Sequence, residues 1–277
     1  MPVITYNAKM NVLVAAKGHP YLRDAFMAIF DKMEGVAATL VEQPAAALLM
    51  NPQAMADFDA MVLYDMPGLD FAAADAPDQR MPDDQFKAGF LALLDQGKGI
   101  VALHHAIAGW PAWETYAELL GGAFRYRAGS LRGQPVLDGG YHHDVAYDAV
   151  VLAKDHPVLT GIPERFSLTD ELYLFEAFED KITPLLAADH RFADRHFYSA
   201  QRAVAGQMFD NKDWHRPDGT RLIGWAKAAG NSPLVYLQPG DGPTAYENPH
   251  YQRLVRNAID WVISPEAQAW ARRQASS

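Results

Sequence analysis

Short, wholly apolar runs alternate with amphipathic stretches along the first 120 residues of the chain. Apolar runs of five or six residues between turn residues predict buried strands at 11–16, 37–41, 60–64 and 99–103. Apolar residues at helical spacing predict helices over 21–33, from Pro82 to a stop at Gly97, and over 112–120. Strands that alternate with helices are typical of an α/β fold, with a mainly parallel sheet covered on both faces.

The second half of the chain has a different texture. Residues 125–141 are irregular and rich in Gly and Arg. Short strands are predicted at 144–153, 172–178, 184–187, 203–209, 222–226 and 234–237, and an amphipathic helix at 250–263. No repeat or long linker divides the sequence. We therefore expect a single domain over residues 1–277, with an irregular, β-rich insertion in its second half.

Composition excludes several classes of protein. The net charge of −10 argues against nucleic-acid or anionic-membrane partners, which need a basic face. The chain has no cysteine, so disulfides, thiolate zinc sites and cysteine nucleophiles are excluded. It shows no basic-then-apolar leader and no apolar run of the roughly 20 residues that span a membrane. We expect a cytoplasmic protein. Whether it is a monomer or a homo-oligomer is left open.

Two adjacent histidines, His104 and His105, end the apolar run at 99–103. Ligands of open α/β sheets bind at the carboxyl ends of the strands, so both are candidate catalytic residues. Neighbours on a regular strand point to opposite faces, which predicts that one ring reaches a pocket while the other packs in the core. His19 follows the first strand and Asp65 ends the third, so both are expected to converge there and bind substrate. For Asp65, a turn-capping role is the alternative.

Adjacent carboxylates, Asp170 and Glu171, precede another predicted strand. A carboxylate that orients a histidine is a common acid–base arrangement, so both are candidate catalytic residues, although one of them could cap a turn. His142 is expected to line the pocket. Carboxylates and histidines also hold metal ions, so a divalent metal is left open, with His19, His104 and His142 as candidate ligands.

Aromatic and turn-rich segments supply further candidates for binding a small molecule. Trp110 and Tyr126, with Trp113 and Trp214, could form a platform for a sugar, although tryptophans more often fill the core. A turn-rich loop at 239–243 follows a strand and carries Asp241, and His250 comes shortly after it. Glycine-rich phosphate loops, dinucleotide fingerprints and the Gly-x-Ser-x-Gly elbow are missing from the sequence.

Several stretches, taken together and in order, resemble the ThuA-like (trehalose utilisation) family. They are GIVALHH at 99–105, WETYAELLGGAF at 113–124, DHPV at 155–158, TDELY at 169–173, NPHY at 248–251 and NAIDW at 257–261. The resemblance implies a flavodoxin-like fold similar to class I glutamine amidotransferases. In those enzymes a cysteine follows a central strand. This chain has His104-His105 in the comparable place, so it is not a glutaminase.

The resemblance also implies a role in carbohydrate catabolism, on a sugar or a 3-keto-sugar. We expect an enzyme, a hydrolase, lyase or isomerase, that uses His104 or His105 as the acid–base group, with Asp170 or Glu171 orienting it. Two alternatives stay open: a metal-dependent sugar hydrolase or isomerase, and a sugar-binding module without catalysis. In each case the expected partner is a small sugar.

Overall fold

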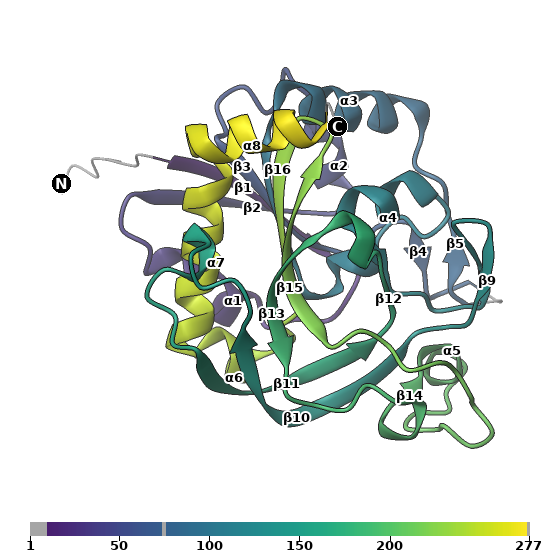
Figure 1. Cartoon of the computed structure of the whole chain (residues 1–277). Coiled ribbons are helices and arrows are strands. Elements are labelled where there is room, and N and C mark those ends of the chain that lie inside the picture. Colours follow the sequence, from purple (N-terminus) through teal and green to yellow (C-terminus); the bar gives the residue numbers. More distant parts are fainter. Residues whose placement is uncertain (1–9, 74–75, 276–277) are drawn as a thin grey trace.

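The structure is a computed structural model that describes residues 10–73 and 76–275. A large sheet runs through the molecule, with helices packed on both faces (Figure 1). Its strands, in spatial order, are β11 (Arg165–Leu174), β10 (Gly140–Val151), β13 (Thr183–Ala188), β15 (Leu222–Ala229), β16 (Ser232–Leu237), β6 (Gly99–Leu103), β3 (Ala60–Asp65), β1 (Met10–Lys17) and β2 (Val36–Glu42). A further short strand, β14 (Tyr198–Ser199), pairs with β10 beside this path.

The sheet has a parallel core and an antiparallel extension. Strands β2, β1, β3, β6 and β16 pair in parallel, whereas β15, β13, β10 and β11 continue the sheet antiparallel. Three two-stranded sheets join β4 (Leu69–Asp70) to β5 (Asp78–Gln79), β7 (Gly122–Ala123) to β12 (Glu176–Ala177), and β8 (Gly129–Leu131) to β9 (Gln134–Val136). The predicted α/β fold with a β-rich second half is confirmed.

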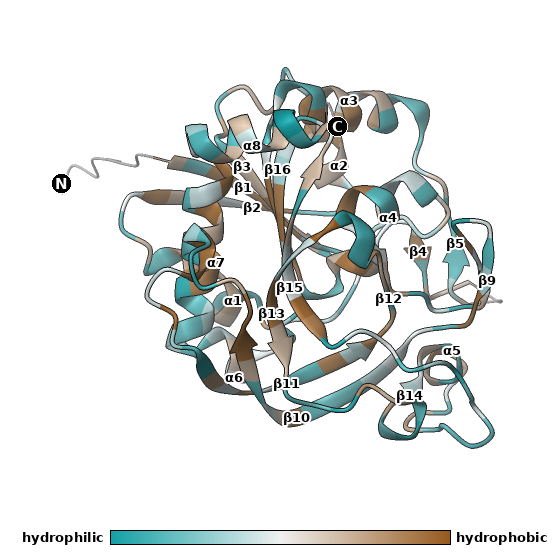
Figure 2. Cartoon of the chain, viewed as in Figure 1, coloured by the Kyte–Doolittle hydropathy of each residue, from teal (hydrophilic) through white to brown (hydrophobic). Residues whose placement is uncertain are grey.

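Helices cover both faces because the inner strands are apolar on both sides. Along β1, Val12 and Val14 pack into one core, and Leu13 and Ala15 into the other. Helices α1 (Arg23–Asp31) and α7 (Pro249–Val262) cover the first core, and α3 (Asp84–Gln96) and α4 (Glu114–Leu120) cover the second. Figure 2 shows the resulting concentration of hydrophobic residues along the central strands.

The remaining elements are short or lie at the periphery. The other helices are α2 (Ala45–Leu49), α5 (Ala200–Val204), α6 (Pro243–Tyr246) and α8 (Pro265–Ala275). The 3-10 turns are η1 (His104–Ala108), η2 (Pro157–Leu159), η3 (Glu179–Lys181) and η4 (Asp194–His196). None of the helices in the described part of the chain is long and apolar enough to cross a membrane.

The predicted signals of the 82–97 helix are confirmed in detail. The Asp83 side chain accepts a hydrogen bond from the backbone N–H of Phe86 at 2.7 Å, which satisfies a donor that the first helical turn leaves free. Gly97 ends the helix with a φ of 86°, a left-handed conformation that glycine adopts without strain. The predicted helices at 21–33, 112–120 and 250–263 correspond to α1, α4 and α7.

Two predicted strands differ from the structure. The strand expected at 203–209 is wrong: the chain forms α5 and then turns, because the Ser199 hydroxyl accepts the N–H of Arg202 at 3.1 Å and starts a helix there. The strand expected at 172–178 begins earlier, at Arg165, and breaks after Leu174, with β12 following it.

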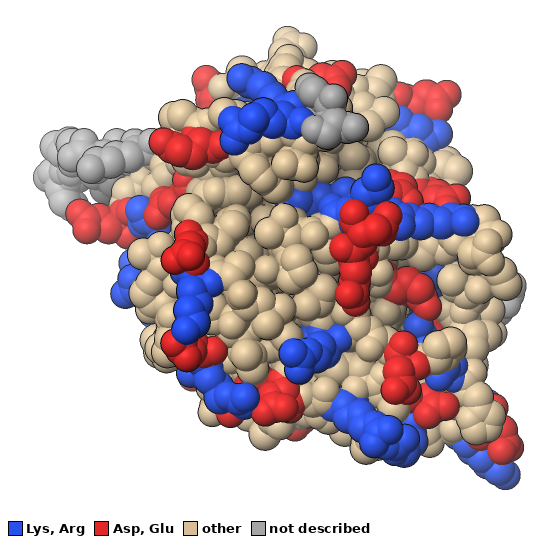
Figure 3. Space-filling model, in the orientation of Figure 1, with Lys and Arg blue, Asp and Glu red and all other residues tan. Residues whose placement is uncertain are grey.

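Basic and acidic side chains are interspersed on the face drawn in Figure 3.

Candidate active site

Polar side chains gather where the parallel strands end. His19 follows β1, His104 follows β6, and Asp241 follows β16. Strands β10 and β11 pass over the same edge of the sheet and contribute His143 and Glu171. The structure thus brings together residues that follow parallel strands and residues from the antiparallel extension of the sheet.

His104 stands at the centre of this group. Its φ of 46° is left-handed, an uncommon conformation for a residue with a side chain, and it turns the chain from β6 into η1. The ring is fully buried and stacks on Tyr173 with 4.7 Å between centroids. Its Nδ1 lies 2.7 Å from the carbonyl oxygen of Gln238, and its Nε2 lies 2.8 Å from the Tyr173 hydroxyl. Because a carbonyl only accepts, Nδ1 carries a proton.

Two carboxylates face the other ring nitrogen of His104. Glu171 Oε2 lies 3.2 Å from Nε2, and Asp241 Oδ1 lies 3.4 Å from it. Burial alone would lower the pKa of His104, but its hydrogen bonds to Asp241 and Glu171 raise that pKa well above its usual value. Burial likewise opposes ionisation of the carboxylates, yet the bonds from His104 lower the pKa of both Glu171 and Asp241 to about 2. All three groups are thus coupled by charge.

A β-bulge brings His143 to the same glutamate. The pairing of β10 with β11 shifts between His142 and Val145, so His143 and Asp144 together oppose Glu171. Asp144 has a φ of 52°, and His143 Nδ1 lies 3.0 Å from Glu171 Oε1. This hydrogen bond raises the pKa of His143.

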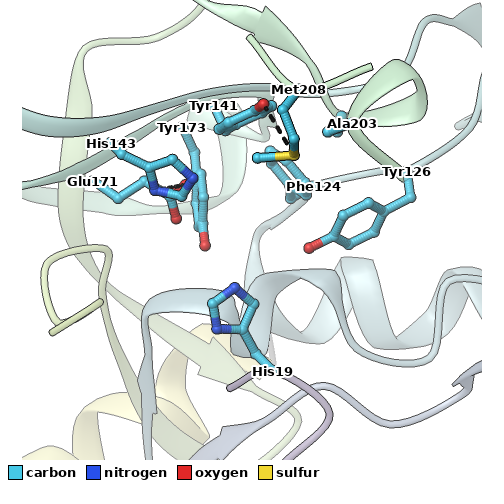
Figure 4. Close-up of a pocket in the computed structure, with 10 residues that line it drawn as sticks. His19, Phe124, Tyr126, Tyr141, His143, Glu171, Tyr173, Ala203 and Met208 are labelled. Carbon is cyan, nitrogen blue, oxygen red and sulfur yellow. Dashed lines mark hydrogen bonds and ion pairs between the residues drawn. The ribbon is translucent and has the colours of Figure 1, made fainter. Parts of the chain in front are cut away.

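His19 approaches from the opposite side of the pocket. Its Nδ1 lies 2.9 Å from the carbonyl oxygen of Pro20, and its ring stacks on His105 with 4.8 Å between centroids. Burial, reinforced by the charge of His104, lowers the pKa of His19. In Figure 4 the ring points into the pocket, toward the hydroxyl of Tyr173.

These residues open onto a pocket with both polar and apolar lining residues. The cavity volume is about 130 Å³, smaller than the roughly 300–1,000 Å³ of sites that enclose drug-sized ligands. Three charged or ionisable residues line the pocket: His143 and Glu171 on one side, and His19 across from them (Figure 4). Its other lining residues are Phe124, Tyr126, Tyr141, Tyr173, Ala200, Ala203 and Met208. A site of this kind matches a ligand that has both hydroxyl or carbonyl groups and a flat or apolar part.

The structure gives His105 and Asp170 supporting positions. His105 is buried, and its Nε2 lies 3.1 Å from the carbonyl oxygen of Tyr64, so its ring supports His19 from behind. Asp170 accepts the backbone N–H groups of Gly240 and Asp241 at 2.6 and 3.1 Å. It thereby holds the loop that carries Asp241. Burial raises the pKa of Asp170 to about 7.

Other predicted site residues lie outside the pocket. Asp65 is buried, and its Oδ2 accepts a 2.6 Å hydrogen bond from Gln43. Trp110 packs on Phe86, with 5.0 Å between ring centroids. The structure places Asp65 and Trp110 against these neighbours and not among the pocket's lining residues.

His142 and His250 also lie elsewhere. The ring of His142 has His190, Phe197 and Tyr198 around it, on the face of β10 opposite His143. His250 lies in the first turn of α7 and packs on Phe166, with 5.2 Å between ring centroids.

The aromatic platform is only partly as expected. Tyr126 lines the pocket, as predicted. Trp214 is buried, and its Nε1 donates to Asp138 at 2.9 Å. Trp113 packs edge-on against Phe90. Both tryptophans follow the alternative interpretation, in which they fill the core.

Sequence reasoning missed His143, Tyr173 and Phe124 as lining residues. Tyr173 lies two positions after Glu171 on β11, and residues two apart on a strand share a face, but the predicted strand began only at residue 172. His143 shares a face with Tyr141 for the same reason. Among the described residues, His104, Glu171 and Asp241 offer three ligand atoms within 4.8 Å of one another, a set that excludes His19 and His142.

The fold and the site together define an α/β protein with a buried histidine–carboxylate centre at the carboxyl edge of its sheet. The family model for ThuA, described as trehalose utilisation, matches residues 11–262. The chain therefore belongs to the ThuA family. No match was found among curated protein sequences.

Solved structures share this fold at low sequence identity. A ThuA-like protein from Parabacteroides merdae is 15% identical, with a TM-score of 0.65 over 92% of this chain and 90% of its own. A ThuA-like protein from Bacteroides uniformis is 15% identical, with a TM-score of 0.62 over 95% of each chain. A protein of Salmonella typhimurium described as cytoplasmic is 12% identical, with a TM-score of 0.55 over 91% of this chain and 99% of its own. Identities this low carry the fold alone.

Proposed function

We propose that the protein is an enzyme of carbohydrate metabolism that acts on a sugar or 3-keto-sugar by acid–base chemistry. The observation that carries the proposal is the buried Glu171 carboxylate, which bridges His104 and His143 beside an aromatic pocket. The family's description as trehalose utilisation supports a sugar as the substrate. The absence of cysteine from the sequence excludes glutaminase chemistry at this site.

The hydrogen-bond partner of His19 supports a role for this residue as the base. Its Nδ1 faces the carbonyl oxygen of Pro20, which only accepts, so Nδ1 carries the proton. The lone pair is then on Nε2, the nitrogen on the pocket side of the ring (Figure 4). A neutral imidazole with a free lone pair in a pocket is the usual general base in enzymes.

His143 has the complementary role of acid. Its Nδ1 faces Glu171 Oε1, and a carboxylate favours the protonated ring. This leaves an Nε2–H that can be given to a substrate oxygen. Two histidines with opposite partners at one pocket provide the base and the acid for a single substrate.

A keto-sugar suits this pair because a carbonyl makes the neighbouring C–H acidic. His19 would take the proton from that carbon, and the electron pair of the C–H bond would move onto the carbonyl oxygen, where His143 would supply a proton.

In an isomerisation, His19 would return the proton to the former carbonyl carbon of the enediol so formed, and the hydroxyl on the neighbouring carbon would lose its proton to His143 and become the new carbonyl. In an elimination, the enol hydroxyl would give its proton back to His143 as the carbonyl re-forms, and the substituent on the carbon next to the former C–H would leave with its bonding electron pair and the proton from His19. The aromatic side of the pocket, with Phe124 and Tyr126, would hold the ring or its substituent.

Deuterium exchange tests the proposal without the reaction being known in advance. The protein is incubated with 3-keto-trehalose or a methyl 3-keto-glucoside in D₂O, and NMR follows exchange and product formation. We expect exchange next to the carbonyl that is lost in His19→Ala and retained in His142→Ala, the matched control. Binding without exchange or product would favour the sugar-binding module. We expect neither nucleic acid nor membrane as a partner, given the net charge of −10.

A further inference from the structure

We propose that His104, Glu171 and Asp241 bind a divalent transition-metal cation such as Zn²⁺. The proposal adds a cofactor to the pocket described above and rests on that site being functional, but metal binding is measurable whatever the reaction is. It also replaces the all-histidine set expected from the sequence with one histidine and two carboxylates.

The positions of charges and protons around His104 indicate a cation at this cluster. Nδ1 holds a proton because it faces the Gln238 carbonyl. A neutral His104 therefore directs its Nε2 lone pair at two carboxylate oxygens, those of Glu171 and Asp241, which are also acceptors. The Tyr173 hydroxyl can donate to Nε2 at 2.8 Å, but it does not neutralise the two carboxylates, whose charges a cation beside Nε2 would balance. That cation is either a proton on Nε2 or a metal ion.

Distances favour the metal ion over the proton. Charge-assisted N–H···O bonds are about 2.7–2.9 Å long. The contacts of Nε2 with Glu171 and Asp241 are 3.2 and 3.4 Å, so one proton shared between the two carboxylates would make only two long hydrogen bonds. Ligand atoms about 2.0–2.2 Å from a tetrahedral Zn²⁺ are roughly 3.3–3.6 Å apart, which agrees with these separations.

The surroundings have the features of a metal site. The Gln238 carbonyl fixes the ring tautomer, as such acceptors do for histidines that ligate metals. Glu171 uses Oε2 for this cluster and Oε1 for His143, so ligation and the acid role of His143 are compatible. The Tyr173 hydroxyl can turn from Nε2 to Glu171, with which it also interacts.

Two carboxylates and a neutral histidine balance a divalent charge. Three protein ligands leave a fourth position for water or a substrate oxygen, which is the pattern of catalytic zinc sites. Glu171 and Tyr173 also line the pocket, so the open position is expected to be reachable from it.

Equilibrium dialysis of untagged protein, stripped with a chelator and then given Zn²⁺, tests the inference. We expect one equivalent bound in the wild type, and binding at least tenfold weaker in Glu171→Gln and in Asp241→Asn. Asp65→Asn is the control, because Asp65 is a buried acid outside the cluster. Co²⁺ should give the visible absorption of a four- or five-coordinate site in the wild type only. Thermal unfolding checks that each variant folds, and Asp241→Asn, on a partly exposed loop, keeps the test usable if Glu171→Gln does not fold.

Two outcomes would overturn the inference. One is less than a tenth of an equivalent of Zn²⁺ at 100-fold excess over protein. The other is equal affinity in the wild type and both cluster variants, which would place the ion elsewhere, for example near His142, His190 and His196. If Zn²⁺ does not bind but the chelated protein still catalyses deuterium exchange that depends on His19, the metal site is rejected and the proposed function stands. If Zn²⁺ binds but no keto-sugar reacts, the metal site stands and the proposed function is rejected.

Discussion

His143 Nδ1 lies 3.0 Å from Glu171 Oε1 because two residues of β10 oppose one residue of β11. The bulge turns His143 toward the glutamate, and its neighbour His142 lies on the other face of the strand. The chain thus carries adjacent histidines with different surroundings, which is a built-in comparison for mutagenesis.

His143→Ala is expected to lower turnover of a 3-keto-glycoside about 10²–10⁴-fold, the usual contribution of a general acid. His142→Ala is expected to stay within threefold of the wild type, since its ring does not line the pocket. Steady-state rates of both purified variants check this. Equal losses in the two variants would mean that the histidines act on folding and not on the reaction.

The bulge itself depends on the backbone of Asp144. Its φ of 52° is left-handed, and a β-branched residue there costs about 1–2 kcal/mol. Asp144→Val should lower the free energy of unfolding by that amount and reduce activity through His143, whereas Asp144→Gly should retain both. Urea denaturation and turnover measure the two effects. A valine variant with unchanged stability would show that this conformation is not required.

Asp170 is expected to act through the loop that it holds. Asp170→Ala leaves the N–H groups of Gly240 and Asp241 without their acceptor, at a cost of about 2–4 kcal/mol of stability. Asp170→Asn keeps an acceptor oxygen, so its loss of stability should be clearly smaller than that of Asp170→Ala. Urea denaturation of the two variants provides the comparison, and equal stabilities would argue against this anchoring role.

The raised pKa of the buried Asp65 predicts that the stability of the protein depends on pH. Burial raises this pKa from 3.8 to about 6 in the folded protein. Between these values the folded state binds more protons than the unfolded state, so stability falls as pH rises through that window. Asp65→Asn removes this loss. Its gain in unfolding free energy over the wild type should be about 1–2 kcal/mol larger at pH 8 than at pH 5.

Denaturant titrations at the two pH values check the Asp65 prediction. The amide introduced by Asp65→Asn would keep an oxygen for the Gln43 side chain, so the substitution changes charge more than shape. A gain of the same size at both pH values would mean that Asp65 titrates normally.

Much of the fold followed from hydrophobic patterns, because buried strands and amphipathic helices leave strong local signals. The runs that became β1, β3 and β6 are apolar on both faces, as strands between two helix layers must be. Helix α5 was missed because its segment, 200–204, is short and stabilised by the Ser199 cap more than by an apolar face. The helical conformation of this segment therefore depends on contacts that the hydrophobic pattern does not show.

The site was predictable where it depends on strand ends and not where it depends on strand pairing. His19, His104 and Asp241 follow parallel strands, and the rule for α/β sheets found all three. The sequence analysis predicted that His142 lines the pocket, whereas the structure places His143 there. The sequence could not show this, because the bulge opposite Glu171 arises only from the pairing of β10 with β11. Asp170 and Glu171 are neighbours in sequence, yet alternation along β11 gives only Glu171 to the pocket.

The position of β16 has a consequence for how the protein matures. This strand, which follows β6 by more than 120 residues, lies between β6 and β15 in the sheet. The Gln238 carbonyl and Asp241, which complete the surroundings of His104, follow directly after it. A nascent chain that ends before residue 232 has neither the central strand nor these partners. The surroundings of His104 are therefore complete only after the chain has been synthesised through Asp241.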